Sequence, residues 1–359
     1  MKKKNMLEYL LALLISVVLA MAVGALIMLA TGHDPLEGYV LMFQGAFATQ
    51  RALGNTLAKA ATLCLTGLAT AVAAQAGIFN VGGEGQLYLG AMASAVLGAK
   101  LAGMSPWIAV PLCLLAAMAA GGLYAWIPGV LKVKMKVDEV ITTILLNTAA
   151  IYFCSYLANG PLKTMERGIS SGTDSVDPAF MFDKLIRRSN LTESLFLTII
   201  ITVFIWYLMK KSTTGFQMKL TGQNGRFARY SGIKSDRLAL LSMVISGALC
   251  GLVGMFEVFG LHKRFIVTVS NEFYFDGMLV AMIARYNPVG IILMSLFFGA
   301  MKIGGAAMEL NAEIPSTLVI IIQSIIIFFM AAEGGVTTLL KERISRRRTA
   351  ATLQKGDQA

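Results

Sequence analysis

The sequence of 359 residues is 56% hydrophobic and only 14% charged. Its mean hydropathy is +0.69. Soluble globular proteins carry about 25% charged residues, so too few charges are present here to cover a water-facing surface. The composition excludes a soluble chain, a disordered or collagen-like chain, a coiled coil and a disulfide-stapled secreted domain, and it predicts an integral membrane protein.

The net charge of +11 does not indicate a nucleic-acid-binding protein. The 31 Lys and Arg residues gather in short clusters between apolar runs, which is the distribution that the positive-inside rule predicts for cytoplasmic loops. We therefore interpret the basic clusters as topology signals, and we expect contact with a lipid bilayer and none with nucleic acid.

The first apolar run covers residues 9–32, and a membrane-spanning helix needs about 20 such residues. Lysines at 2–4 precede this run, which is longer than the core of a cleavable signal peptide. We expect a retained helix with a cytoplasmic N-terminus. Residues 53–131 are long enough for about three further spans, with breaks at 77–85 and 103–106.

The middle of the chain alternates between basic and mixed-charge loops. A basic turn at 132–136 precedes a fifth span at about 140–158, and residues 159–192 then form a polar segment of nearly balanced charge. A sixth span at about 194–209 is followed by the strongly basic segment 210–237. The positive-inside rule predicts an extracytoplasmic loop over 159–192 and a cytoplasmic loop over 210–237.

The last third of the chain is less regular. A seventh span is expected at about 238–260, and the last at about 314–330. Between them, Pro288 interrupts residues 277–303 and disfavours helix at Asn287, which predicts two half-length helices there.

The predicted architecture is an all-α polytopic membrane protein with about ten transmembrane helices (8–10) and both termini in the cytoplasm. Residues 1–340 form a single transmembrane domain, and residues 341–359 form a basic cytoplasmic tail.

Motifs of catalytic and metal sites are absent from the sequence. It contains no GxxxxGK[ST], HExxH or GxSxG pattern and only two histidines, His33 and His262, both in predicted outside loops. The four cysteines lie singly in apolar stretches without metal-ligand spacing: Cys64, Cys113, Cys154 and Cys250. We expect a protein that is not itself an enzyme and that binds no metal or cofactor.

The segment 76–90 places Asn80, Glu84 and Gln86 among glycines in an otherwise apolar third of the chain. Irregular backbone at membrane depth is tolerated only where protein or a water-filled cavity satisfies its polar groups, and such breaks mark substrate pathways in transporters. Together with Asn147 of the fifth span, these are the candidate pathway residues. The alternative is a cytoplasmic turn in which Glu84 and Gln86 cap the next helix.

A short internal sequence similarity and two charged residues in predicted spans are weaker indications of function. Residues 276–279 (Asp-Gly-Met-Leu) echo residues 84–87 (Glu-Gly-Gln-Leu), which fits an internal repeat but is too short to establish one. Lys59 and Glu257 lie within predicted spans. Charges at such depth indicate a cavity or a partner, unless the side chains reach an interface by snorkelling.

The basic segment 221–237 contains more than charge. Gly222 and Asn224 break the chain, and residues 226–230 favour one short exposed helix that Gly232 closes. Its aromatic side chains would then face the cytoplasm, as in a docking element. The alternative is a basic loop that only sets the topology.

Two stretches resemble one family of proteins. They are Gly77-Ile-Phe-Asn-Val-Gly-Gly-Glu-Gly-Gln86 and Gly222-Gln-Asn-Gly-Arg-Phe-Ala-Arg-Tyr-Ser-Gly-Ile233. They are similar to the GIFNIGGEGQ and GxNxxAAxYSGI patterns of permease subunits of bacterial ABC importers in the branched-chain amino acid and simple sugar group, nucleoside branch. The sequence departs from these patterns at Val81 and Phe227.

The resemblance implies a fold like that of the vitamin-B12-importer permease and a multi-pass protein of the bacterial plasma membrane. It also implies three partners: a second permease that is usually a different chain, a cytoplasmic ATPase that binds ATP and Mg, and an extracytoplasmic binding lipoprotein. The ATPase would dock on the loop over 210–237 through Gly222, Asn224, Arg226, Phe227, Tyr230, Ser231 and Gly232.

The expected function is that of a permease subunit of an ATP-driven importer of nucleosides. One alternative is the same machinery importing a simple sugar such as ribose. The other is an ion-coupled secondary transporter in which Glu84 and Glu257 titrate.

Overall fold

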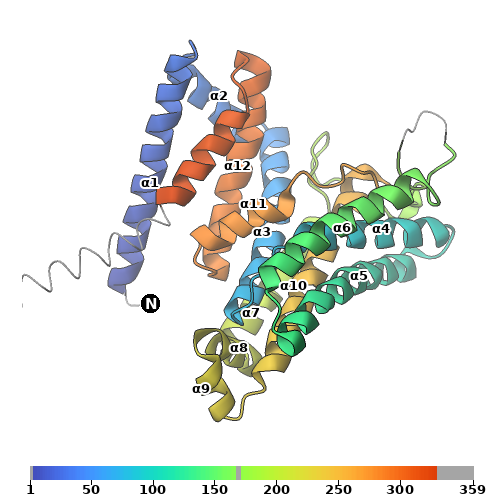
Figure 1. Ribbon diagram of the computed structural model, residues 1–359. Coiled ribbons are helices and arrows are strands. Elements are labelled where there is room, and N and C mark those ends of the chain that lie inside the picture. The colour runs from blue at the N-terminus through green and yellow to red at the C-terminus, as the bar shows by residue number, and fades with distance from the viewer. Residues whose placement is uncertain (1–2, 167–170, 330–359) are drawn as a thin grey trace, which may run out of the picture. The chain divides into compact units, whose positions relative to one another are not determined.

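The computed structural model describes residues 3–166 and 171–329, with side chains from residue 17 onward. Over these residues the chain is helical and contains no β-sheet (Figure 1). The chain divides into two compact units, one of Met1–Gly45 with Gly304–Ala359 and one of Ala46–Ile303. The prediction of one domain over 1–340 remains a prediction, and the predicted tail over 341–359 lies outside the described residues.

The second unit holds most of the helices. They are α3 (Gln50–Gln75), α4 (Gly83–Lys100), α5 (Pro106–Met135), α6 (Glu139–Asn159), the 3-10 turn Pro178–Phe180, α7 (Ser194–Lys211), α8 (Thr213–Gln223), α9 (Gly225–Tyr230), α10 (Ser235–Glu257) with a π-helical extension Val258–His262, α11 (Phe273–Ile283) and most of α12 (Pro288–Ala312). The first unit contains α1 (Lys3–Ala30), most of α2 (Pro35–Phe47) and the apolar helix Thr317–Phe329.

Six helices of the described chain are long and apolar enough to cross a membrane: α3, α5, α6, α7, α10 with its extension, and α12. Three shorter apolar helices accompany them: Val17–Ala30, α11 and Thr317–Phe329. The chain is therefore a multi-pass membrane protein, as the composition predicts. The bounds of α6, α7 and α10 agree with the predicted fifth, sixth and seventh spans to within a few residues.

The region around Pro288 differs from its prediction. A half-length helix forms before the proline, since α11 has 11 residues, but the helix after it has 25 residues and is full-length. Pro288 is the first residue of α12, where its missing N–H would have had no intrahelical partner in any case. The prediction of a second half-length helix is wrong because the proline begins a helix instead of interrupting one.

The centre of the second unit is α10, which packs against α3, α4 and α5. Gly251 makes this possible, since a Cβ added there would lie 2.1 Å from the carbonyl oxygen of Ala117 on α5. Only a residue without a side chain lets the two backbones approach this closely.

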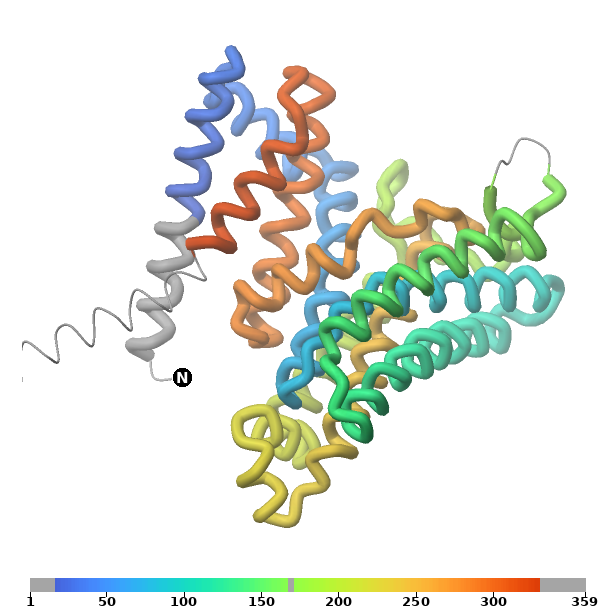
Figure 2. Tube along the Cα trace, viewed as in Figure 1, coloured from blue at the N-terminus to red at the C-terminus, as the bar shows by residue number. Residues whose placement is uncertain are grey.

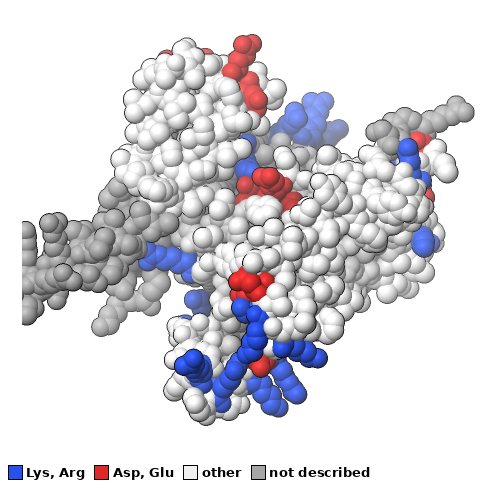
Figure 3. Space-filling view, viewed as in Figure 1, with Lys and Arg blue, Asp and Glu red and all other residues white. Residues whose placement is uncertain are grey.

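Two small apolar clusters bring the basic loops to one end of this unit. One contains Ala73 and Ala239 with Val133 packed on it, and the other contains Met218 and Leu238. The ends of α3 and α5, the start of α10 and α8 therefore lie together, near the yellow segment at the lower end of Figure 2. Lys and Arg gather at the same end (Figure 3), which the positive-inside rule assigns to the cytoplasm.

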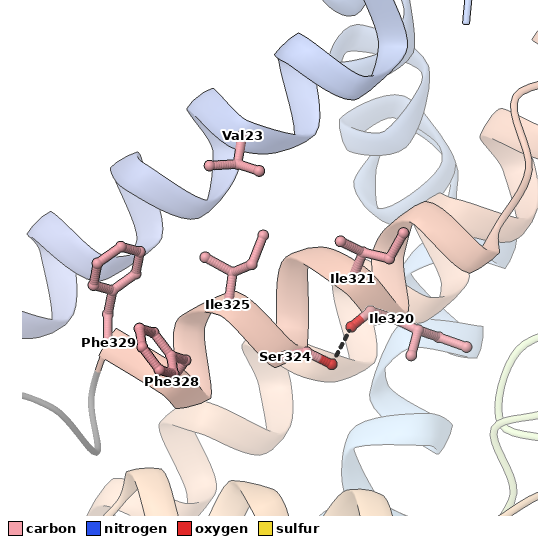
Figure 4. Close-up of a pocket in the computed structure, with 7 residues that line it drawn as sticks. All are labelled: Val23, Ile320, Ile321, Ser324, Ile325, Phe328 and Phe329. Atoms are coloured by element: carbon pink, nitrogen blue, oxygen red, sulfur yellow. Dashed lines mark hydrogen bonds between the residues drawn. The ribbon is translucent and has the colours of Figure 1, made fainter. Parts of the chain in front are cut away.

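Apolar grooves occur in each unit. In the first unit a groove of about 440 Å³ lies beside Val23 and the helix Thr317–Phe329, where the hydroxyl of Ser324 donates to the carbonyl of Ile320 at 2.8 Å (Figure 4). In the second unit a groove of about 330 Å³ lies between α5, α7 and α10. Apart from Ser324, the lining side chains of both grooves are apolar, so they offer a polar solute few hydrogen-bonding partners.

The loop over 159–192 is tied down by ionic and backbone contacts. Arg264 donates to the carboxylate of Glu166 at 2.7 Å and also to the hydroxyl of Ser175. The hydrogen bond from Arg264 holds the pKa of Glu166 below its usual value. The pKa of Asp177 is lowered by hydrogen bonds from the backbone N–H groups of Ala179 and Gly103.

The lowered pKa of Glu166 predicts how the stability of the folded protein depends on pH. The Glu166 carboxylate stabilises the folded loop fully above its unfolded pKa, and this contribution is lost as the pH falls through the lower folded pKa. Glu166→Gln should therefore lower the apparent Tm in detergent at pH 7, and the difference from the wild type should shrink in acid below about pH 4. Asp174→Asn, at an exposed acid of the same loop, is the control. A difference independent of pH would contradict this assignment.

Candidate functional site

The segment 76–82 interrupts the helices in the middle of the unit. After α3 ends, the chain turns at Gly77 and runs without helix until α4 begins at Gly83. The first turn of α4 packs on α6, because a Cβ added at Gly85 would lie 3.0 Å from the Cα of Asn147. Asn147 lies eight residues into α6, about 12 Å along the helix. The start of α4 therefore lies beside the middle of α6, which is long and apolar enough to cross a membrane.

The side-chain amides of Asn80 and Gln86 stabilise the non-helical segment 76–82 through hydrogen bonds. Asn80 donates to the side-chain oxygen of Gln86 at 2.9 Å, and Gln86 donates back to Asn80 at 3.1 Å. Asn80 also donates to the hydroxyl of Ser246 on α10 at 3.0 Å and accepts from the N–H of Gly82. Both amides are almost fully buried. In this conformation they form hydrogen bonds with other groups of the protein and not with a solute.

The neighbouring helix α6 satisfies two further backbone groups. The side-chain oxygen of Asn147 accepts from the N–H of Gly85 at 2.5 Å, and the hydroxyl of Thr143 accepts from the N–H of Val81 at 3.2 Å. Asn147 therefore lies beside the glycine-rich segment, and its place on a substrate pathway stays a prediction. Thr143 was not predicted, since a threonine inside an apolar run gives no local signal.

Glu84 joins the starts of two helices. Its carboxylate accepts from the backbone N–H of Tyr274, in the first turn of α11, at 2.9 Å. The ring of Tyr274 lies against Gly83, and its hydroxyl donates to the carbonyl of Asn80. The two segments of the sequence echo therefore begin neighbouring helices, and a negative charge at the N-termini of both is favourable. Tyr274 was not predicted.

Charged side chains surround this junction. Lys302 of α12 forms an ion pair with Asp276 of α11. Glu257 of α10 accepts from the hydroxyl of Thr62 at 3.0 Å. Lys59 of α3 lies over an aromatic ring, with its ammonium 3.5 Å from the ring centroid of Phe273. Lys302 was visible in the sequence as a lone charge in an apolar run, and Phe273 carried no such signal.

The non-helical segment 76–82 also contacts the predicted docking segment, the basic loop over 210–237. A Cβ added at Gly77, whose φ is +78°, would lie 2.9 Å from the Cα of Gly222. The side chain of Gln75 strengthens this contact by donating to the carbonyl oxygens of Gly215 at 2.7 Å and Met209 at 3.2 Å. The two sequence motifs are therefore in direct backbone contact.

The docking segment itself forms two short helices, α8 and α9. Asn224 caps α9 by accepting from the N–H of Phe227 at 3.0 Å, and Ala228 is buried. Tyr230 is 93% exposed. All seven residues predicted to contact an ATPase are exposed: Gly222, Asn224, Arg226, Phe227, Tyr230, Ser231 and Gly232.

The whole arrangement is that of a transport protein: interrupted helices at membrane depth and an exposed helix at the basic end. A comparison with protein families matches residues 52–331 to the permease component of branched-chain amino acid transport systems. The chain belongs to this permease family.

Similar proteins of known role are permeases as well. The permease is 34% identical over 319 residues, 88% of its length and 91% of the other chain, to the guanosine ABC transporter permease protein NupP of Bacillus subtilis. It is 33% identical to the nucleoside ABC transporter permease protein NupB of Lactococcus lactis, covering 85% and 86% of the two chains. It is 31% identical to the glucose ABC transporter permease protein TsgB13 of Haloferax volcanii, covering 86% and 83%. No solved structure matches significantly.

The contact between the motifs predicts the effect of Gly77→Ala. The new Cβ would meet Gly222 and would force a non-glycine residue into a left-handed conformation, which costs about 1–2 kcal/mol. We expect a lower apparent Tm of the purified permease and reduced uptake in cells.

Gly225→Ala is the matched control, since nothing lies within 4 Å of a Cβ added at Gly225. Equal Tm values for the two variants would contradict the close approach at Gly77.

Proposed function

We propose that this permease is the membrane-spanning subunit of an ATP-driven ABC importer of nucleosides. The observation that carries the proposal is the exposed helix α9, whose preceding residues touch the glycine-rich break. A transporter driven only by an ion gradient needs no such contact. The similarity to guanosine and nucleoside permeases supports the substrate class.

The mechanism follows from this contact. A cytoplasmic ATPase binds ATP and Mg and docks on α9 through Arg226, Phe227 and Tyr230. Closure of the ATPase moves α8 and α9 together. Gly222 passes the movement to Gly77 and so to the segment before α4, which alternates the pathway between outside-open and inside-open states. This chain binds no nucleotide and catalyses no reaction.

The number of spans, the cellular location and the partner subunits are also proposed. Adding α4 to the six long and three shorter apolar helices supports ten spans, a fold like that of the vitamin-B12-importer permease, and both termini in the cytoplasm. We propose a bacterial plasma membrane location, a second and different permease chain, and an extracytoplasmic binding lipoprotein that delivers the substrate.

The four candidate pathway residues act on the shape of the pathway in this proposal. Asn80, Gln86 and Asn147 fix the irregular backbone through the hydrogen bonds described above, and Glu84 fixes the start of α11. Their substitution would deform the wall of the pathway even where the side chains make no contact with the substrate.

Two other functions are distinguishable. The similarity to a glucose permease favours a simple sugar as a second substrate class. An ion-coupled transporter would need Glu84 and Glu257 to titrate freely, and hydrogen bonds from Tyr274 and Thr62 engage their carboxylates.

The deciding experiment measures uptake of radiolabelled guanosine, adenosine, uridine, ribose and glucose by cells with and without this gene. Each measurement is repeated in a strain whose partner ATPase cannot hydrolyse ATP. We expect nucleoside uptake to be lost in both defective strains. Loss of sugar uptake alone would replace the substrate, and uptake that survives without ATP hydrolysis but collapses with an uncoupler would replace the mechanism.

A second prediction concerns the docking helix. Tyr230→Ala should lower nucleoside uptake at least tenfold, because an exposed aromatic anchor at an interface contributes about 2 kcal/mol or more. The amount of permease in the membrane should stay unchanged, since Tyr230 is 93% exposed. Tyr152→Ala on α6, at a side chain that is 71% exposed, is the control, and equal uptake by both variants would exclude docking through Tyr230.

A further inference from the structure

The segment that leads into α11 does not form a helix. It runs from Lys263 to Glu272 (Figure 2, the non-helical orange tube before α11). Its first residues join the loop over 159–192, because the N–H of Thr173 donates to the carbonyl of Phe265 at 3.1 Å and the N–H of Phe265 donates to the hydroxyl of Thr173 at 3.2 Å. Its end lies beside the start of α4, because Tyr274 packs on Gly83.

Within the described residues, Tyr88 of α4 contacts this segment. The hydroxyl of Tyr88, five residues into α4, donates to the carbonyl of Val267 at 3.0 Å and lies 3.4 Å from that of Ser270. Asn271 and Glu272 are exposed. A carboxylate and an amide beside the start of α4 are too costly to face lipid, so they face water or another protein.

The backbone of the segment is strained at both ends. Lys263 has a φ of +64° and Glu272 a φ of +58°, in the left-handed region that non-glycine residues seldom adopt. Such strain costs about 1–3 kcal/mol at each residue and gathers at ligand-binding sites. Glu272 directly precedes the first residue of α11, and its side chain makes no capping hydrogen bond.

A cation and an aromatic ring lie next to Glu272. Phe273 is partly exposed, and the Lys59 ammonium lies over its ring. Within the described part of the chain, no carboxylate forms an ion pair with Lys59. Lys59 is half-buried, and an ammonium without an ion-paired carboxylate can donate to an acceptor on an incoming molecule.

We propose that Glu272, Phe273 and Lys59 form a nucleoside-binding site on the wall of the pathway, an inference that rests on the proposed function. The carboxylate of Glu272 accepts hydrogen bonds from the ribose hydroxyls. The ring of Phe273 packs against the base, and the ammonium of Lys59 donates to a base carbonyl or ring nitrogen. A neutral molecule with a diol and a flat heterocycle uses all three groups.

The first test uses Glu272→Gln in the complete transporter. We expect the KM for guanosine to rise about tenfold, as for the loss of one good charged hydrogen bond. The preference for guanosine over 2′,3′-dideoxyguanosine should also disappear, which a merely structural change would not cause. Asp174→Asn, at an exposed loop acid, should change neither quantity.

Two outcomes of this uptake test distinguish failure of the proposed binding site from failure of the proposed function. If the wild type imports guanosine but Glu272→Gln keeps the same KM and the same preference, the site is wrong and the proposed function stands. If the wild type imports no nucleoside, the proposed function fails, and the nucleoside class of this site fails with it.

A second test places the segment in the pathway whatever the substrate. The described cysteines Cys64, Cys113, Cys154 and Cys250 are all buried, so Asn271→Cys can be labelled against a low background. We expect a membrane-impermeant cationic thiol reagent to modify it in the nucleotide-free or the vanadate-trapped complex, and Leu293→Cys, at a side chain 62% exposed on α12, to stay unmodified. No labelling of Asn271→Cys in either state would overturn the proposal and would place this face against the second permease.

Discussion

The hydrogen bond from the Tyr274 N–H to the Glu84 carboxylate joins the two interrupted helices of this permease. In a membrane, irregular backbone survives only where each buried N–H and C=O finds a partner within the protein. Glu84 meets this need for α11, and Asn80, Thr143 and Asn147 meet it for the segment before α4. Two non-helical segments, 76–82 and 263–272, can therefore end side by side.

This junction links the two ends of the molecule. On the basic side, Gly77 touches the docking segment at Gly222. Six residues later the chain reaches Gly83, which supports Tyr274 and so the segment from the outer loop. In the proposed mechanism, a displacement at α9 reaches both non-helical segments through the contacts of Gly77 with Gly222 and of Gly83 with Tyr274. Close backbone packing along α10 keeps the surrounding helices rigid enough to transmit it.

The sequence predicted the features that depend on local pattern. Apolar runs located α6, α7 and α10, and chain-breaking residues with basic charge located α9. Contacts between distant residues could not be predicted this way: Tyr274 and Asn80 are 194 positions apart, and neither shows its partner. The echo of residues 84–87 in 276–279 was the one signal of this pairing, and it was too short to identify Tyr274, which precedes the echo.

Hydrogen exchange at the peptide that contains Tyr274 measures whether Glu84 holds the start of α11. Glu84→Gln keeps an acceptor oxygen of the same size, and Glu84→Leu removes it and leaves a buried N–H unsatisfied, at a cost of about 1–3 kcal/mol. In the complete transporter in nanodiscs, exchange should be slowest in the wild type, faster in Glu84→Gln and fastest in Glu84→Leu. Exchange in Glu84→Leu as slow as in the wild type would contradict the account.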